Sequence, residues 1–230
     1  MTTFDFQKGE FILIDKPYQA TSFDMVKRVK YHAKRISGIK GIKVGHAGTL
    51  DPLATGLLII CTGKMTKEID SFQAQEKEYT GTFYLGATTP SFDLEKEVDQ
   101  WFDISAITEE QIQGVKNLFI GEIEQTPPIF SAVKIDGKRA YDYARNDEEV
   151  HIKAKKIHIY DFELLRISLP EIDFRIRCSK GTYIRSLARD FGLALNSGAH
   201  LIALRRTKIG NFKVEDAFTL DQFKELAEKL

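Results

Sequence analysis

A glycine-rich stretch early in the chain constrains this sequence more than any other feature. It contains three glycines, one proline and a single carboxylate, and it reads Gly45-His46-Ala47-Gly48-Thr49-Leu50-Asp51-Pro52-Leu53-Ala54-Thr55-Gly56. Glycine permits positive φ and close backbone approach, while Pro52 fixes its own φ and biases Asp51 towards an extended conformation. The pattern predicts a stiff, narrow loop that presents Asp51.

An apolar run follows this loop directly. Residues 57–61 read Leu-Leu-Ile-Ile-Cys, which is the length of a buried strand and too short to span a bilayer. We therefore expect the loop to be anchored on a hydrophobic strand and the Asp51 carboxylate to be held in place. The alternative is an ordinary Asp-Pro turn whose carboxylate only satisfies neighbouring amides, because aspartate is a common turn residue.

Length and composition indicate a globular protein without a metal or disulfide. The 230 residues, 43% of them hydrophobic, can form a full core, and we expect one domain over residues 1–230. No apolar segment has the length of a membrane span and the first residues lack a secretory signal, so we expect a cytoplasmic protein. Cys61 and Cys178 lie in separate apolar runs with no metal-ligand spacing.

Charge is balanced overall but unevenly distributed. The chain has 33 basic and 33 acidic residues. One segment before the glycine loop has only basic charges, namely Lys27, Arg28, Lys30, Lys34, Arg35, Lys40 and Lys43. A later segment is acidic and expected at the surface, with Asp93, Glu95, Glu97, Asp99 and Asp103. The basic run fits either a solvated helix face or a phosphate-binding surface.

The pattern of apolar and breaking residues predicts helices and strands in alternation. Strands are expected at 11–14, 57–61, 77–85, within 151–178 and at 200–208, and helices at 22–35, 65–72, 108–118, 183–191 and 219–230. Ser22 is the expected cap of the first helix. Lys16, just before Pro17, is either a turn lysine or a brace for the glycine loop.

Residues 125–150 predict a projection from the domain. Prolines at 127 and 128 exclude regular structure there, and Asp136-Gly137 predicts a tight hairpin turn followed by a helix. Its polar side chains suit contact with a polyanion, and they include Lys134, Lys138, Arg139, Tyr141 and Arg145. Taken together, the elements predict an α+β fold with a large mixed, mostly antiparallel sheet flanked by helices.

Several of these segments together resemble a known family. They are the block at 45–58, Lys16-Pro17, Lys77-Glu78-Tyr79, residues 125–145, the Cys178 to Arg185 block and Leu204-Arg205-Arg206. In this order they resemble the bacterial tRNA pseudouridine-55 synthases of the TruB type, over nearly the whole chain. The resemblance implies a pseudouridine synthase fold that isomerises the T-loop uridine of tRNA without a cofactor.

The resemblance also implies roles for particular residues. Asp51 corresponds to the catalytic carboxylate, Arg185 to its partner and Tyr79 to the aromatic residue that stacks on the target base. Tyr183, Leu204, His46 and Lys16 correspond to further residues of the substrate pocket. Each of these side chains, taken alone, also fits an ordinary structural role.

We expect the enzyme to extrude the target base and to grip the T arm of tRNA. The candidate RNA-binding residues are Lys27, Arg28, Lys43, Lys134 and Arg145. We expect a monomer with no obligate protein partner.

The chain departs from the family in three places. Gln19 stands where relatives usually have glycine, Ala47 replaces a more frequent threonine, and no RNA-binding terminal domain of the PUA type is expected. We therefore expect tRNA affinity to depend steeply on salt.

Three other functions fit parts of the pattern. They are a guide-RNA-dependent pseudouridine synthase subunit, a tRNA-binding folding chaperone and an aspartate-dependent glycosidase. The glycosidase requires two carboxylates at matched distance, and only Asp51 stands in the motif loop.

Overall fold

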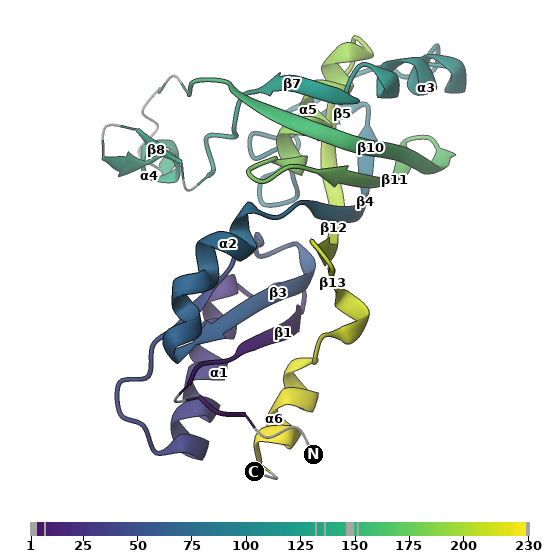
Figure 1. Ribbon diagram of the computed structural model, residues 1–230. Coiled ribbons are helices and arrows are strands. Elements are labelled where there is room, and N and C mark those ends of the chain that lie inside the picture. Colours follow the sequence, from purple (N-terminus) through teal and green to yellow (C-terminus); the bar gives the residue numbers. More distant parts are fainter. Residues whose placement is uncertain are drawn as a thin grey trace. The chain divides into compact units, whose positions relative to one another are not determined.

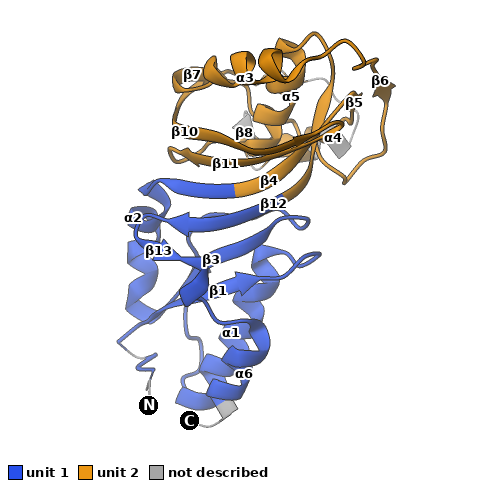
Figure 2. Cartoon of the chain, turned by 90° about the vertical axis from the view of Figure 1, so that its right-hand side faces the viewer, with its two compact units in different colours: residues 1–79, 204–230 blue, residues 80–203 orange. Residues whose placement is uncertain are grey.

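The computed structural model describes residues 4–6, 8–131, 133–135, 137–145, 150 and 152–228 (Figure 1). The chain forms two compact units, which Figure 2 distinguishes by colour. Unit 1 comprises residues 1–79 and 204–230, and unit 2 comprises residues 80–203. The expectation of a single domain over the whole chain stays a prediction.

The sheet of unit 1 is built around one buried strand. β3 (Thr55–Thr62) is buried from Gly56 to Thr62, so the strand expected after the glycine loop is confirmed. β1 (Phe11–Lys16) and β2 (Val44–His46) pair antiparallel with β3, whereas the part of β12 (Ala199–Ile209) in unit 1 pairs parallel with it. β13 (Phe212–Lys213) closes a turn back onto β12. The loop between β2 and β3 therefore starts and ends on the same sheet.

Helices cover this sheet, and one start differs from expectation. α1 (Ser22–Ser37) has Thr21 as its N-cap, in a capping box with Asp24, so the expected Ser22 cap is wrong. Ser22 is buried instead, and its hydroxyl is used elsewhere. The other helices of unit 1 are η1 (Gly63–Glu68), α2 (Ile69–Ala74), η2 (Val214–Asp216) and α6 (Leu220–Glu228).

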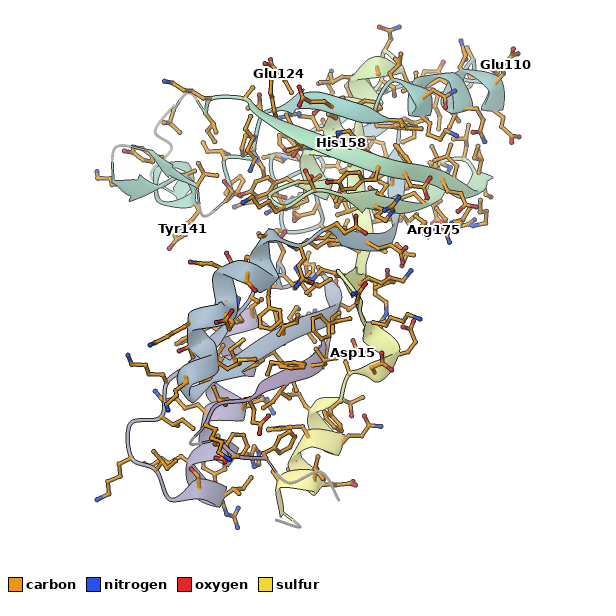
Figure 3. All side chains as sticks on the ribbon, viewed as in Figure 1. Asp15, Glu110, Glu124, Tyr141, His158 and Arg175 are labelled. Atoms are coloured by element: carbon orange, nitrogen blue, oxygen red, sulfur yellow. The ribbon has the colours of Figure 1, made fainter. Side chains whose placement is uncertain are left out.

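The apolar face of α1 fixes that helix on the sheet. Met25, Val26, Val29 and Ala33 recur at helical spacing and join a buried cluster with β1, β3 and Phe223 of α6. Arg205 of β12 adds a polar tie, since its two terminal nitrogens lie 2.7 and 2.9 Å from the carboxylate oxygens of Asp15 in β1. Asp15 is labelled in Figure 3.

Unit 2 contains a second group of strands. Its order is β4-β11-β10-β7, of which β4 (Lys77–Leu85) begins in unit 1. β10 (Lys155–Ser168) pairs antiparallel with both β11 (Glu171–Cys178) and β7 (Gly121–Gln125). The helices α3 (Glu109–Asn117) and α5 (Ile184–Ala194) belong to this unit, with the small pair β5 (Ala87–Thr88) and β6 (Gln100–Trp101). The mixed, mostly antiparallel α+β fold is confirmed.

Phenylalanine rings fill the core of unit 2. Phe83, Phe162, Phe174 and Phe191 are fully buried, and the rings of Phe83 and Phe174 lie 4.2 Å apart between centroids. Alternation along β11 turns Ile172, Phe174 and Ile176 inwards, as the sequence predicts.

The projection of unit 2 is a hairpin followed by a helix. β8 (Lys134–Ile135) pairs with β9 (Lys138–Arg139), and α4 (Ala140–Arg145) follows. Figure 1 shows these elements set apart from the strands of the same unit. The hairpin and helix are confirmed, while the side chains of Lys134 and Arg145 lie outside the described part of the structure.

Candidate active site

The loop that presents Asp51 is closed by backbone hydrogen bonds at both ends. The amide of Ala47 donates to the carbonyl of Ile59 at 2.9 Å, and the amide of Ala54 donates to the carbonyl of Asp51 at 3.1 Å. The second bond closes a four-residue turn with Pro52 at its second position, which suits the fixed φ of proline. Gly48 has a φ of +97°, a conformation that favours glycine. Asp51 is partly exposed on this turn.

Ser22 of α1 clamps the residue before Asp51. Its hydroxyl accepts a hydrogen bond from the amide of Leu50 at 2.8 Å and donates one to the carbonyl of the same residue at 3.0 Å. Both residues are buried, so water does not replace these bonds. The backbone adjoining Asp51 is thereby tied to the first turn of α1.

Arg206 of β12 holds the loop from the opposite side. Its side chain is only 1% exposed, and Nε donates to the carbonyl of Leu57 at 2.8 Å while Nη2 donates to the carbonyl of Gly48 at 3.1 Å. A Cβ on Gly56 would lie 2.3 Å from the carbonyl oxygen of Arg206, so only glycine fits there. Sequence analysis included Arg206 in a family motif but did not predict that it holds the loop. The one feature that could have indicated this role is a charged residue inside an apolar strand.

Lys16 is a second buried cation at the loop. Its Nζ donates to the carbonyls of Ala20, Pro17 and Pro52 at 2.6, 3.1 and 3.3 Å. Burial lowers its pKa to about 8, the charge of Asp51 acts in the opposite direction, and Arg206 lowers it further. These bonds support the interpretation of Lys16 as a brace for the glycine loop rather than an ordinary turn lysine. Contact between Lys16 and the substrate stays a prediction.

His46 enters the loop from β2 as a neutral side chain. Burial and the positive charge of Arg206 lower its pKa below the usual value of 6.5, and a backbone hydrogen bond with Gly48 offsets part of this. Within the described residues its buried Nδ1 has no hydrogen-bond partner. His46 is therefore an uncharged ring at the start of the loop, and its place in a substrate pocket stays a prediction.

Tyr79 and Leu204 complete the expected residues of unit 1. Tyr79 on β4 is 8% exposed and Leu204 on β12 is half-buried. The preceding residue, Glu78, accepts hydrogen bonds from Thr207 Oγ1 at 2.8 Å and Lys208 Nζ at 3.0 Å. These bonds fix the start of β4, so the position of Tyr79 is set by the strand rather than by a mobile loop.

The two remaining residues expected in the pocket, Tyr183 and Arg185, belong to unit 2. Tyr183 precedes α5. Its backbone N–H donates to Oε1 of Gln125 at 2.8 Å, and its carbonyl accepts from Nε2 of the same side chain at 3.1 Å. Lys155 Nζ lies 4.6 Å from the centre of the Tyr183 ring. Arg185 is 5% exposed and donates to the carbonyl of Phe130 at 3.0 Å. Since Asp51 lies in unit 1 and Arg185 in unit 2, the expected pairing of the two stays a prediction.

Asp93 departs from the surface position expected for the acidic segment. It is 4% exposed, and its Oδ2 lies 3.6 Å from Nε of Arg185. The other acidic residues of the segment are exposed as predicted, namely Glu95, Glu97, Asp99 and Asp103. A buried carboxylate needs an oppositely charged partner to offset its lost hydration. The sequence around Asp93 does not reveal that Arg185 is this partner, so the burial of Asp93 was not predicted.

The basic residues expected to bind RNA are exposed where the structure describes them. Lys27 and Arg28 lie on α1 and Lys43 on the segment before β2. Among the described residues no group of three or more His, Cys, Asp or Glu side chains has the arrangement of a metal site. No helix in the same residues combines the length and apolar character that crossing a membrane requires.

Comparison with known families assigns the class of protein. Residues 34–184 match the model of the TruB family pseudouridylate synthase N-terminal domain, and residues 185–229 match that of the tRNA pseudouridylate synthase B C-terminal domain. The chain belongs to the TruB family of pseudouridylate synthases.

Individual relatives narrow the class. A protein named tRNA pseudouridine synthase B from Phocaeicola vulgatus is 57% identical over 96% of this chain and 94% of its own length. One of the same name from Flavobacterium johnsoniae is 57% identical over 98% of this chain and 99% of its own.

Solved structures share the fold. The chain resembles one in a Cbf5-Nop10-Gar1 complex, with a TM-score of 0.72, 31% identity and coverage of 97% of this chain. It also resembles one in the archaeal box H/ACA sRNP Nop10-Cbf5 complex, with a TM-score of 0.69 and 29% identity. This chain spans 57% and 55% of the lengths of those two chains.

Proposed function

We propose that this protein is a tRNA pseudouridine synthase that isomerises the T-loop uridine at position 55. The observation that carries the proposal is the fixed Asp51 turn in a chain of the TruB family, held by Ser22, Lys16 and Arg206. The names of the 57% identical relatives support tRNA as the substrate. The lower identity of about 30% to the Cbf5 chains does not favour a guide-RNA-dependent subunit.

The reaction moves one bond from nitrogen to carbon. The C1′–N1 bond of uridine breaks, the uracil turns, a C1′–C5 bond forms, C5 loses its proton and N1 gains one. The product is an isomer of the substrate, so no oxidant, reductant or group donor is required. A carboxylate close to the sugar and base serves either as a nucleophile or as a stabiliser of developing positive charge.

The surroundings of Asp51 suit that task. Three hydrogen-bonding side chains fix the backbone of the loop, so the carboxylate does not have to be positioned when substrate arrives. Asp51 and Lys16 interact electrostatically, since the charge of Asp51 raises the pKa of Lys16 against the effect of burial. In this proposal Tyr79 stacks on the extruded base, a contact worth about 1–3 kcal/mol, and Arg185 pairs with Asp51.

The neutral His46, with Leu204 and Tyr183, lines the pocket in this proposal, and basic residues contact the tRNA backbone. Lys27, Arg28, Lys43, Lys134 and Arg145 are the candidates for these phosphate contacts. We place the protein in the cytoplasm as a monomer, where its tRNA substrate is made.

A tritium-release assay tests the proposal. Unmodified tRNA transcript labelled at uridine C5 is incubated with wild type and with Asp51→Asn, and released tritium is measured together with RNA binding. We expect release by wild type and a decrease of at least about 10⁴-fold for the variant, with unchanged binding. A second transcript with cytidine at position 55 should release no tritium from the T loop. Binding without release by wild type would remove the synthase proposal and favour the tRNA-folding chaperone.

A further inference from the structure

A cavity in unit 1 lies outside the residues assigned to the Asp51 site. It has a volume of about 300 Å³, which is within the range of small-molecule sites. The residues that line it are Phe6, Ile39, Ile42, Lys43, Gly63, Lys64, Thr66 and Lys67.

The walls of this cavity are apolar and firmly packed. Phe6 and Ile42 are 2% and 5% exposed and belong to the core cluster beneath α1, and Ile39 packs against the same cluster. The rim is tied together, because the amide of Gly63 donates to the carbonyl of Lys43 at 2.9 Å. The cavity therefore has a fixed apolar wall, of which Ile39 is the half-buried and most accessible residue.

Three of the lining residues are lysines, and none has an acidic partner within the described residues. Lys43, Lys64 and Lys67 are exposed, and no lining residue is acidic. Over the ranges that the structure describes, none of the three takes part in an ion pair, whereas Lys8 and Lys27 each pair with an aspartate at 3.4 Å. An apolar cavity beside unneutralised cations suits a ligand with an apolar body and negative charge.

We propose that this cavity binds the base of an unpaired nucleotide in the bound RNA, with its flanking phosphates at Lys43, Lys64 and Lys67. A base has an apolar face that packs against the half-buried Ile39, and unpaired bases are the usual targets of such pockets in RNA-binding proteins. A nucleotide within a chain has a phosphate on each side, which matches several ammonium groups better than the single phosphate of a free nucleotide.

This inference rests on the proposed function only in taking RNA as the partner. The nucleotide in the cavity is not the uridine that reacts, since the cavity shares no residue with the loop that carries Asp51. It adds a contact that contributes to affinity and leaves the chemical step unchanged.

Salt dependence of tRNA binding tests the phosphate contacts. The double variant Lys64→Ala/Lys67→Ala should reduce the magnitude of the slope of log K against log salt by about 1.4–1.8, because each phosphate contact contributes about 0.7–0.9. The control Lys213→Ala/Lys224→Ala removes the same charge from exposed positions of unit 1. Its slope should match that of wild type.

A cavity-filling variant tests the base. Ile39→Trp should raise the Kd for tRNA at least tenfold with an unchanged salt slope, since it blocks the base and leaves the lysines in place. Thermal melting reports whether the variant folds, and Ile39→Phe replaces it if it does not. Binding as tight as wild type by a folded cavity-filling variant would overturn the proposal.

Two further outcomes separate this proposal from others. If wild type releases no tritium, the synthase proposal fails, and the salt slopes still test whether the cavity binds RNA. If the lysine variant and the control variant have equal slopes, only the proposal about the cavity is refuted. Uridine 5′-monophosphate is titrated in parallel. If it binds saturably and depends on Lys64 and Lys67 while the tRNA slopes are equal, the cavity takes a free nucleotide and our proposal is wrong.

Discussion

Lys16 and Arg206 illustrate how single buried residues support the Asp51 loop. Both are cations with essentially no exposure, and both use their charge to bind backbone carbonyls rather than a carboxylate. Hydrogen bonds from charged donors contribute about 1.5–3 kcal/mol each, which helps to offset the cost of burying the charge. The loop therefore depends on groups that the motif itself does not contain.

Lys16 should make activity depend on pH. Because its pKa is about 8, Lys16 loses its charge as pH rises through that value, and its bonds to the carbonyls of the loop weaken. We expect kcat/KM for tRNA to fall above pH 8 in wild type. Lys16→Met should have lower activity throughout and lack this decline, as measured by tritium release from pH 6.5 to 9.5. An identical decline in the variant would assign the titration to another group.

Lys16 should also affect stability, with the opposite trend. Its pKa is about 8 in the folded state and 10.5 for the free side chain, so between these values the unfolded chain binds more protons. The free energy of unfolding of wild type should therefore rise with pH relative to that of Lys16→Met. Urea unfolding of both proteins at pH 7 and pH 9.5 measures this difference. A difference that stays constant would show that Lys16 titrates at its usual value when folded.

Gln19 occupies a left-handed backbone conformation that glycine adopts more easily than other residues. Its φ is +61°, in the left-handed region, and its side chain is exposed. A side chain in this region costs about 1–2 kcal/mol, while glycine adds some entropy to the unfolded chain. We expect Gln19→Gly to raise the free energy of unfolding by about 0.5 kcal/mol. Chemical denaturation tests this, with Gln19→Ala as a control that should show no gain.

At the scale of elements, two consecutive residues at the start of α1 have different structural roles. Thr21 caps the helix, and Ser22 clamps Leu50 in the loop. The sequence predicted the helix from its apolar periodicity but assigned the cap to Ser22. Two adjacent hydroxyl residues both satisfy the local capping pattern, and only the position of a loop 28 residues away decides which one is buried.

Substitution of each residue should separate these tasks. Thr21→Ala should cost about 1 kcal/mol of stability with kcat unchanged, as is usual for loss of a helix cap. Ser22→Ala leaves the buried amide and carbonyl of Leu50 unsatisfied, which should lower the free energy of unfolding by about 1–3 kcal/mol. Because the backbone next to Asp51 is then less firmly held, kcat should fall at least about tenfold. Denaturation curves and single-turnover assays of both variants provide the comparison. A larger loss of kcat in Thr21→Ala would contradict this division.

How far the sequence predicts the structure depends on the range of the interactions. The strands β3, β4 and β11 follow from continuous or alternating apolar residues, which are local patterns. The contacts of Arg206 with Gly48 and of Arg185 with Asp93 join residues about 90 to 160 positions apart, so periodicity does not reveal them. The residues expected around Asp51 were predicted from the family motif, which does not give the distances between them.

At the scale of the whole molecule, a chain with no net charge is proposed to bind a polyanion. The formal charge is zero, so attraction to tRNA has to come from local clusters of lysine and arginine rather than from the overall field. Many surface cations of unit 1 lie on α1 and around the cavity next to Lys43, where few carboxylates neutralise them. Affinity should then depend on a limited number of phosphate contacts.

Salt titration of tRNA binding measures that number. With some five phosphate contacts, a slope of log K against log salt of about −3.5 to −4.5 is expected. Charge-reversed Lys27→Glu/Arg28→Glu should make the slope less steep and raise KM at low salt, with kcat at saturating tRNA unchanged because neither residue is assigned a place beside Asp51. A flat salt dependence in wild type would mean that affinity comes mainly from stacking and shape, and that the basic face of α1 is only a solvated surface.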